Sequence, residues 1–219
     1  MKGKEKKILI GGASCLVAFV IWTWLVQSID VKTAPGTGTE VGFAAFIFWF
    51  HELTGVYMTI YNITDWLGLV PVFVCMAFGI LGMKQMIKRK KLLKVDLDLI
   101  LLGIYYVLVI GGYLIFEMIP INYRPILIEG RLEASYPSST TLLVLSVMPT
   151  LYFQAEKRFQ NVVVKKCVHL FTILFSAFMV VGRMISGVHW FTDIVGAGFL
   201  STGLFCIYKS LAELWYQKR

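Results

Sequence analysis

Long apolar runs, each about the length of a membrane-spanning helix, recur along the sequence. A spanning helix needs about 20 predominantly apolar residues. The pattern predicts six such helices, at Ile8–Ile29, Leu67–Met83, Leu97–Ile119, Ser139–Ala155, Cys167–Ser186 and Thr192–Tyr208. The expected fold class is therefore an all-α membrane protein, a bundle of six transmembrane helices in which residues 1–219 form a single integral membrane domain.

The composition supports this interpretation. Hydrophobic residues make up 58% of the chain and charged residues only 16%, whereas about 25% of the residues in an average soluble domain are charged. A soluble fold of this length has too small an interior to bury so many apolar side chains. These proportions exclude a disordered chain and an ordinary cytosolic enzyme.

Basic residues are distributed unevenly between the two sides of the predicted membrane domain. Seventeen of the 21 Lys and Arg residues lie near the termini or in the loops after the second and fourth predicted helices, and the other four are Lys32, Arg124, Arg131 and Arg183. Because cytoplasmic loops carry an excess of basic residues, both termini are predicted to face the cytoplasm. The net charge of +8 thus reflects membrane orientation, and we expect no nucleic-acid partner.

The segment Asp30–Trp66, between the first two predicted helices, is rich in aromatic residues. Its first apolar stretch has about 11 residues, which is too short to span a membrane. Aromatic side chains suit the bilayer interface, so we expect one or two helices that lie on the outer membrane surface. His51 and Glu52 have no partner motif in this segment and are interpreted as solvated side chains.

Two polar clusters lie on the side opposite the termini. The first occupies the loop after the third predicted helix, where Arg124 and Pro125 are followed by the run Ser138-Ser139-Thr140-Thr141. Ser and Thr at the start of a helix commonly satisfy free backbone N–H groups. Taken alone, this run is most simply explained as a helix cap.

The second cluster lies at the junction of the last two predicted helices. His189 and Asp193 are four residues apart and therefore share one face at the start of a helix. A carboxylate that hydrogen-bonds one imidazole nitrogen fixes the tautomer and makes the other nitrogen a better nucleophile. Arg183, near the same membrane interface, either extends toward lipid headgroups or lines a site.

The two clusters are predicted to meet on one side of the membrane. Helix N-termini attract anions through their free N–H groups and partial positive charge. Arginine side chains bind phosphate oxygens in a bidentate manner. Two arginines, a Ser-rich helix start and a His–Asp pair therefore indicate a phosphoryl-transfer site. The competing explanation is an interfacial His and Arg with an Asp that caps a helix.

These residues resemble the type-2 phosphatidic acid phosphatase (PAP2) superfamily of membrane lipid phosphatases, whose signatures are K-x6-R-P, P-S-G-H and S-R-x5-H-x3-D. The third signature matches at Arg183, His189 and Asp193, with Gly182 in place of the family's Ser. The resemblance implies that His189 forms a phosphohistidine, that Asp193 orients it and that Arg183 holds the phosphate. It also implies chemistry without a metal or another cofactor.

The first signature matches only in part. Arg124 and Pro125 fit its R-P, but Glu117 stands where the family has Lys. A cation that contacts phosphate is therefore missing, and the resemblance leaves Arg124 as the phosphate-binding residue of this signature.

The second signature also departs from the family. Ser138 matches, Ser139 replaces the family's Gly, and Thr140 replaces the His that is expected to protonate the leaving alkoxide. The resemblance places Ser138 and Ser139 in the phosphate site and Thr140 at a catalytic position. A threonine hydroxyl is too weak an acid for this role, so hydrolysis of a lipid monophosphate should be slower by about 10²–10⁴-fold.

Thr140 therefore predicts one of three situations. A lipid diphosphate expels a phosphate monoester, which leaves readily, so diphosphates such as undecaprenyl diphosphate are favoured. Alternatively, the protein is weakly active or inactive. The third reading is that Thr140 is an introduced substitution.

The expected function is that of a membrane-embedded hydrolase that removes phosphate from a lipid phosphate or polyprenyl diphosphate. The expected location is a cell membrane, with the active site on the extracytoplasmic side and the membrane lipid as the partner. The alternative is a degenerate protein of the same family that binds lipid phosphates without efficient turnover. Replacing His189 by Ala distinguishes the two, because it abolishes the function only of the enzyme.

Overall fold

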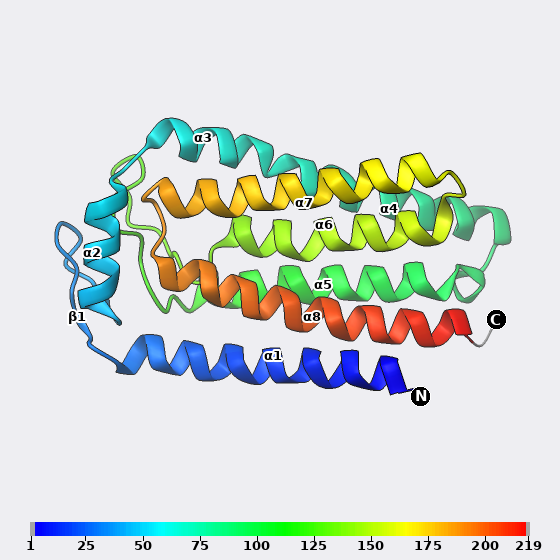
Figure 1. The fold of residues 1–219 in the computed structure, drawn as a ribbon, viewed down its shortest axis with the longest axis horizontal. Helices are drawn as coiled ribbons and strands as arrows, with labels where there is room; N and C mark the ends of the chain where they lie inside the picture. The colour runs from blue at the N-terminus through cyan, green and yellow to red at the C-terminus, as the bar shows by residue number, and fades with distance from the viewer. Residues whose placement is uncertain (1–2, 218–219) are drawn as a thin grey trace.

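The computed structural model describes residues 3–217. Long helices run side by side in a bundle, and both ends of the described chain lie at the same end of it (Figure 1). The helices are α1 (Gly3–Ser28), α2 (Ala44–Thr54), α3 (Met58–Leu67), α4 (Leu69–Arg89), the short 3-10 helix η1 (Leu92–Lys94), α5 (Leu97–Met118), α6 (Ser139–Arg158), α7 (Val162–Ile185) and α8 (Phe191–Gln217). Before α2, β1 (Lys32–Thr33) pairs antiparallel with β2 (Glu40–Val41), with Lys32 opposite Val41.

The helices expose apolar side chains on the outside of the bundle. Trp24 of α1, Phe73 of α4, Val107 of α5 and Leu170 of α7 are each at least 60% exposed. Soluble proteins rarely expose large contiguous apolar surfaces, whereas a lipid bilayer favours them. The chain is a multi-pass membrane protein, as the sequence predicts.

The number of apolar helices differs from the prediction. Within residues 3–217, five helical stretches are long and apolar enough to cross a membrane: Gly3–Ser28, Met58–Arg89, Leu97–Met118, Val162–Ile185 and Phe191–Gln217. The expected sixth stretch, Ser139–Ala155, is helical as part of α6 but does not belong to this set.

Burial explains why α6 is less apolar than its neighbours. It lies in the middle of the bundle and runs alongside α5, α7 and α8 (Figure 1). Its polar residues Thr141, Ser146 and Thr150 are fully buried against other helices. Because protein rather than lipid surrounds α6, small polar side chains find partners there, as Thr150 does with the Tyr106 hydroxyl at 2.7 Å.

The second apolar helix also begins earlier than predicted. The expected boundary was Leu67, but α3 leads directly into α4 and Met58–Arg89 forms one candidate span. α3 packs along α7, and Arg183 of α7 donates a hydrogen bond to Asp65 of α3. Part of the segment expected on the membrane surface therefore belongs to the bundle. α2 lies across the end of the bundle (Figure 1), and its location at a membrane interface stays a prediction.

Glycines allow α1 and α8 to pack closely. A Cβ atom on Gly203 of α8 would lie 2.6 Å from Cδ2 of Leu16, and one on Gly12 of α1 would lie 3.0 Å from the carbonyl oxygen of Gly203. Small residues let the backbones of membrane helices approach each other in this way.

Substituting Gly203 by Val should therefore push α1 away from α8. Overpacking of this kind costs about 1–3 kcal/mol, and the loss is measured as a lower thermal unfolding midpoint of the protein in detergent. Gly198→Val is the matched control, because a Cβ at Gly198 on the same helix meets no atom within 4 Å. An equal loss in both variants would contradict the role of close packing at Gly203.

Candidate active site

Two segments that are distant in the sequence meet at the end of the bundle opposite the described chain ends (Figure 1). They are the loop between α5 and α6 and the turn between α7 and α8. The indole N–H of Trp190 donates to the carbonyl oxygen of Tyr123 at 2.9 Å. The backbone N–H of Ser138 donates to the carbonyl oxygen of Asp193 at 3.2 Å. These bonds bring the two polar clusters of the sequence together.

His189 lies in the turn before α8 and faces Asp193 in the first turn of that helix. Nδ1 of His189 is 3.6 Å from Oδ2 of Asp193, and both side chains are buried. Asp193 also accepts the backbone N–H of Trp190 at 2.9 Å and the side-chain amide of Asn122 at 3.5 Å. These donors fix the carboxylate beside Nδ1, so Nε2 is the nitrogen free to react.

Burial lowers the pKa of His189 below its ordinary value of 6.5, and the nearby charges of Arg124 and Arg183 act in the same direction. Asp193 opposes this shift but does not reverse it. The imidazole is therefore uncharged at neutral pH, and its lone pair is available for nucleophilic attack.

Arg183, near the outer end of α7, is only 1% exposed. Its Nη2 atom donates to Oδ1 of Asp65 at 2.9 Å and to the hydroxyl of Thr140. Its guanidinium carbon lies 4.7 Å from the centre of the Tyr61 ring. The predicted phosphate-binding arginine is thus positioned by side chains from α3 and α6.

Arg124 approaches the same aromatic ring from the α5–α6 loop. Its guanidinium carbon lies 5.6 Å from the centre of the Tyr61 ring. Its Nε is 3.1 Å from a carboxylate oxygen of Glu133. The two predicted phosphate-binding arginines therefore converge on Tyr61, although they come from segments about sixty residues apart in the sequence.

Several buried polar atoms at this convergence have no hydrogen-bond partner among the described residues. They are Nη1 of Arg124, Nε of Arg183 and both ring nitrogens of His189. Leaving buried donors unpaired costs free energy, so such groups call for an explanation. An anion with several oxygens, such as phosphate, would satisfy the arginine donors and lie beside His189.

A polar cavity of about 400 Å³ gives access to His189 and Arg124. Arg131 and Ser139 also contribute to its wall. Glu117, which stands where the family has Lys, lines it as well. The cavity therefore contains the predicted nucleophile and one of the two predicted phosphate-binding arginines, together with a carboxylate that weakens its attraction for anions.

The three consecutive residues at the start of α6 face different surroundings. Ser138 is fully buried, and its hydroxyl donates to that of Thr141 at 3.0 Å. Its side chain accepts no backbone N–H, so the explanation of Ser138 as a conventional helix cap is wrong. Ser139 lines the polar cavity, whereas Thr140 lines a neighbouring apolar groove.

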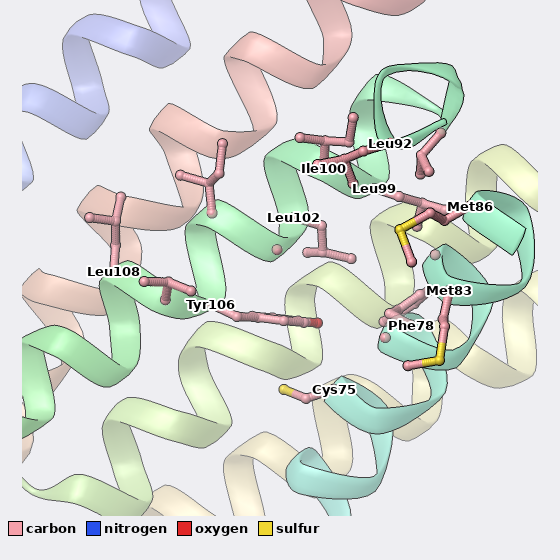
Figure 2. Close-up of a pocket in the computed structure, with 16 residues that line it drawn as sticks. Cys75, Phe78, Met83, Met86, Leu92, Leu99, Ile100, Leu102, Tyr106 and Leu108 are labelled. Atoms are coloured by element: carbon pink, nitrogen blue, oxygen red, sulfur yellow. The ribbon is translucent and has the colours of Figure 1, made fainter. Parts of the chain in front are cut away.

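This outer groove, of about 470 Å³, runs between α4 and α5. Ser139 and Tyr113 line both the polar cavity and the outer groove, so the two adjoin. Cys75 lines both the outer groove and an inner groove of about 560 Å³. Figure 2 shows the inner groove, where Phe78 of α4 lies near Tyr106 of α5 and sulfur atoms of the α4 methionines face the same space.

The sequence analysis missed four residues that complete this arrangement: Tyr61, Asp65, Asn122 and Glu133. Asp65 carried a usable signal, because an ionisable residue beside an apolar helical run often marks a site. The other three carried none, since their roles depend on contacts across the fold.

Comparisons with known proteins agree with this arrangement. The family model described as the PAP2 superfamily matches residues 113–216, which include Arg124, Thr140, Arg183, His189 and Asp193. No curated protein matches the chain. Among solved structures, the fold is similar to that of a transmembrane PAP2 type phosphatidylglycerolphosphate phosphatase from Bacillus subtilis, with a TM-score of 0.64 and 17% sequence identity. The match covers 93% of this chain and 96% of the Bacillus chain.

The family match and the shared fold confirm the resemblance that the sequence motifs indicate. Residues 113–216, which contain the paired arginines and the His–Asp pair, match the PAP2 superfamily model.

Proposed function

We propose that the protein is a membrane-embedded phosphatase that removes phosphate from a lipid phosphate or a polyprenyl diphosphate. The observation that carries this proposal is the convergence of unpartnered buried donors from Arg124 and Arg183 beside the uncharged imidazole of His189. Such a site binds a phosphate group and presents a nucleophile to its phosphorus atom.

In this proposal Nε2 of His189 attacks the phosphorus atom and forms a phosphohistidine. Asp193 stabilises the positive charge that develops on the ring and holds the proton on Nδ1. The arginine donors bind the phosphate oxygens, and their charges offset the negative charge of the transition state. Water then hydrolyses the phosphohistidine and releases inorganic phosphate. No step requires a metal ion.

The grooves support a lipid as the substrate. The polar cavity accommodates a phosphate headgroup, and the outer and inner grooves continue from it between α4 and α5 as an apolar surface. A hydrocarbon chain in these grooves would keep its contact with apolar groups while the headgroup reacts. The similar Bacillus subtilis protein is named for a lipid phosphate, phosphatidylglycerolphosphate.

The location of the site supports action at the outer leaflet of a cell membrane. The candidate site lies at the end of the bundle opposite the described chain ends (Figure 1). The excess of Lys and Arg near the termini and in the loops at their side favours a cytoplasmic location for that side. The site then faces the extracytoplasmic surface.

Two observations favour the alternative, a protein that binds lipid phosphates without efficient turnover. Glu117 lines the polar cavity, and the hydroxyl of Thr140 is bound to Arg183. Glu117 supplies no cation, and Thr140 supplies no readily transferred proton. A measurement of phosphate release from a lipid phosphate distinguishes the two functions.

The purified protein should release phosphate from a lipid monophosphate, a lipid diphosphate or both, and His189→Ala should abolish the release. The expected loss reaches the detection limit, because no other imidazole lies in the cavity wall. Phosphate release is measured in detergent micelles with the two lipid classes in parallel. Unchanged release by His189→Ala would contradict the proposed nucleophile, and lipid binding without release would favour the alternative.

The pH dependence should reflect the lowered pKa of His189. The ring must be uncharged to attack, so protonation reduces kcat/KM only as the pH falls below 6.5. Arg124→Gln removes a positive charge that lowers this pKa, and the acidic limb should therefore move toward higher pH. The acidic limbs of the wild-type protein and of Arg124→Gln are measured with a lipid diphosphate. A fall of wild-type kcat/KM that begins above pH 6.5 would contradict the assignment of this limb to His189.

Inorganic phosphate should bind the site and stabilise the folded protein. At a concentration of 100 times Kd, a ligand that binds only the native state adds about 2.7 kcal/mol of stability. The measurement is the rise in thermal midpoint relative to chloride at equal ionic strength. Arg124→Gln should reduce the rise, whereas an equal rise in both proteins would place the anion elsewhere.

A further inference from the structure

Asp65 is the carboxylate that shares a hydrogen-bond donor with Thr140. Its Oδ1 lies 2.9 Å from Nη2 of Arg183, and the same nitrogen donates to the hydroxyl of Thr140. The two oxygens are therefore adjacent on one guanidinium nitrogen. The α3–α4 junction lies next to the start of α6, since a Cβ on Gly68 would be in ordinary van der Waals contact with Cγ2 of Thr140, at 3.6 Å.

Asp65 differs from the other carboxylates near the site. Asp193 is fully buried and faces His189, Glu133 faces Arg124, and Glu117 lines the polar cavity but not the outer groove that contains Thr140. The Asp65 side chain is 57% exposed and lines the outer groove next to Thr140. It therefore contacts the candidate phosphate-binding arginine and is not enclosed by protein.

We propose that Asp65 is the proton donor and acceptor of the reaction, in the place where Thr140 cannot serve. This inference rests on the proposed phosphatase function. In the first step the His189 Nε2–phosphorus bond forms, the bond from phosphorus to the leaving oxygen breaks, and that oxygen takes the proton of the Asp65 carboxylic acid. The products of this step are the lipid alcohol, the phosphohistidine and the Asp65 carboxylate.

The second step returns the proton. A water molecule attacks phosphorus, and its proton passes to the Asp65 carboxylate as the phosphorus–nitrogen bond breaks. Inorganic phosphate leaves, and both His189 and Asp65 regain their starting forms. The cycle consumes one water molecule and requires no further reactant.

The proposed phosphate site and Asp65 are joined through Arg183. Nη2 of Arg183, which holds Asp65, belongs to the same guanidinium as the free Nε that a phosphate anion would bind. The phosphate and the Asp65 carboxylate would therefore share one arginine. The other titratable groups that line the outer groove are Cys75 and Tyr113.

The test is the Asp65→Asn variant, which keeps the shape of the side chain but cannot transfer a proton. On a lipid monophosphate, kcat should fall by about 10²–10⁴-fold, the usual contribution of a general acid. On a lipid diphosphate the fall should be much smaller, because the leaving phosphate monoester needs no proton. Glu52→Gln is the control, since Glu52 is an exposed carboxylate on α2 that faces another pocket.

A second variant separates proton transfer from the mere positioning of Arg183. Thr140→His, introduced into Asp65→Asn, places a titratable ring beside the same arginine nitrogen and should restore most of the monophosphate activity. An equal fall of kcat on both lipids without such rescue would overturn the proposal in favour of a structural role. A lower KM with unchanged kcat would overturn it in favour of simple competition for Arg183.

The same assays distinguish failure of this inference from failure of the proposed function. A wild-type protein that releases phosphate through His189 but is unaffected by Asp65→Asn contradicts only the role of Asp65. A wild-type protein that releases phosphate from neither lipid contradicts the phosphatase function and the role of Asp65 together.

Discussion

The buried guanidinium of Arg183 is the interaction on which the arrangement of this protein depends. A charge that is almost entirely removed from solvent must be paired and hydrogen-bonded, because an isolated buried ion is very costly. The partners of Arg183 come from α3 and α6, as the Asp65 carboxylate, the Thr140 hydroxyl and the Tyr61 ring. This requirement holds α3 against α7 and places the start of α6 beside the end of α7. The same pairing brings Arg124 close, since both guanidinium groups approach Tyr61.

The helices were largely predictable from the sequence because lipid imposes a simple rule on them. A helix that faces lipid must be apolar along its whole length, and α1 (Gly3–Ser28) and α5 (Leu97–Met118) follow this rule. α6 departs from it, since its neighbours cover it and its polar residues bond within the bundle. α3 begins the second apolar stretch earlier than expected. Its aromatic residues fit an interfacial helix, but it contacts Arg183, 118 residues away along the chain, and leads directly into α4.

The candidate site, like the fold, could be predicted only in part from the sequence. His189 and Asp193 are four residues apart, so helical geometry alone predicts that they face each other. The predicted orientation of the helices places this pair on the same side of the membrane as Arg124. Asp65 was not predicted as part of the site, because nothing in its local sequence indicates its partner. Ser138 was expected as a helix cap, but its hydroxyl donates to that of Thr141, and its role as a phosphate ligand stays a prediction. Local spacing thus predicts pairs within one element, and pairs between elements require the fold.

The charges of the site explain why a carboxylic acid suits the role proposed for Asp65. Burial, together with the charges of Arg124 and Arg183, lowers the pKa of His189 and leaves the proposed nucleophile uncharged. A carboxylic acid is uncharged when it carries its proton, so these arginines do not repel its acidic form. Asp65 also shares Nη2 of Arg183 with the hydroxyl of Thr140. The proposed proton donor therefore lies beside the arginine that is proposed to bind the phosphate, and one buried guanidinium joins the two proposed roles.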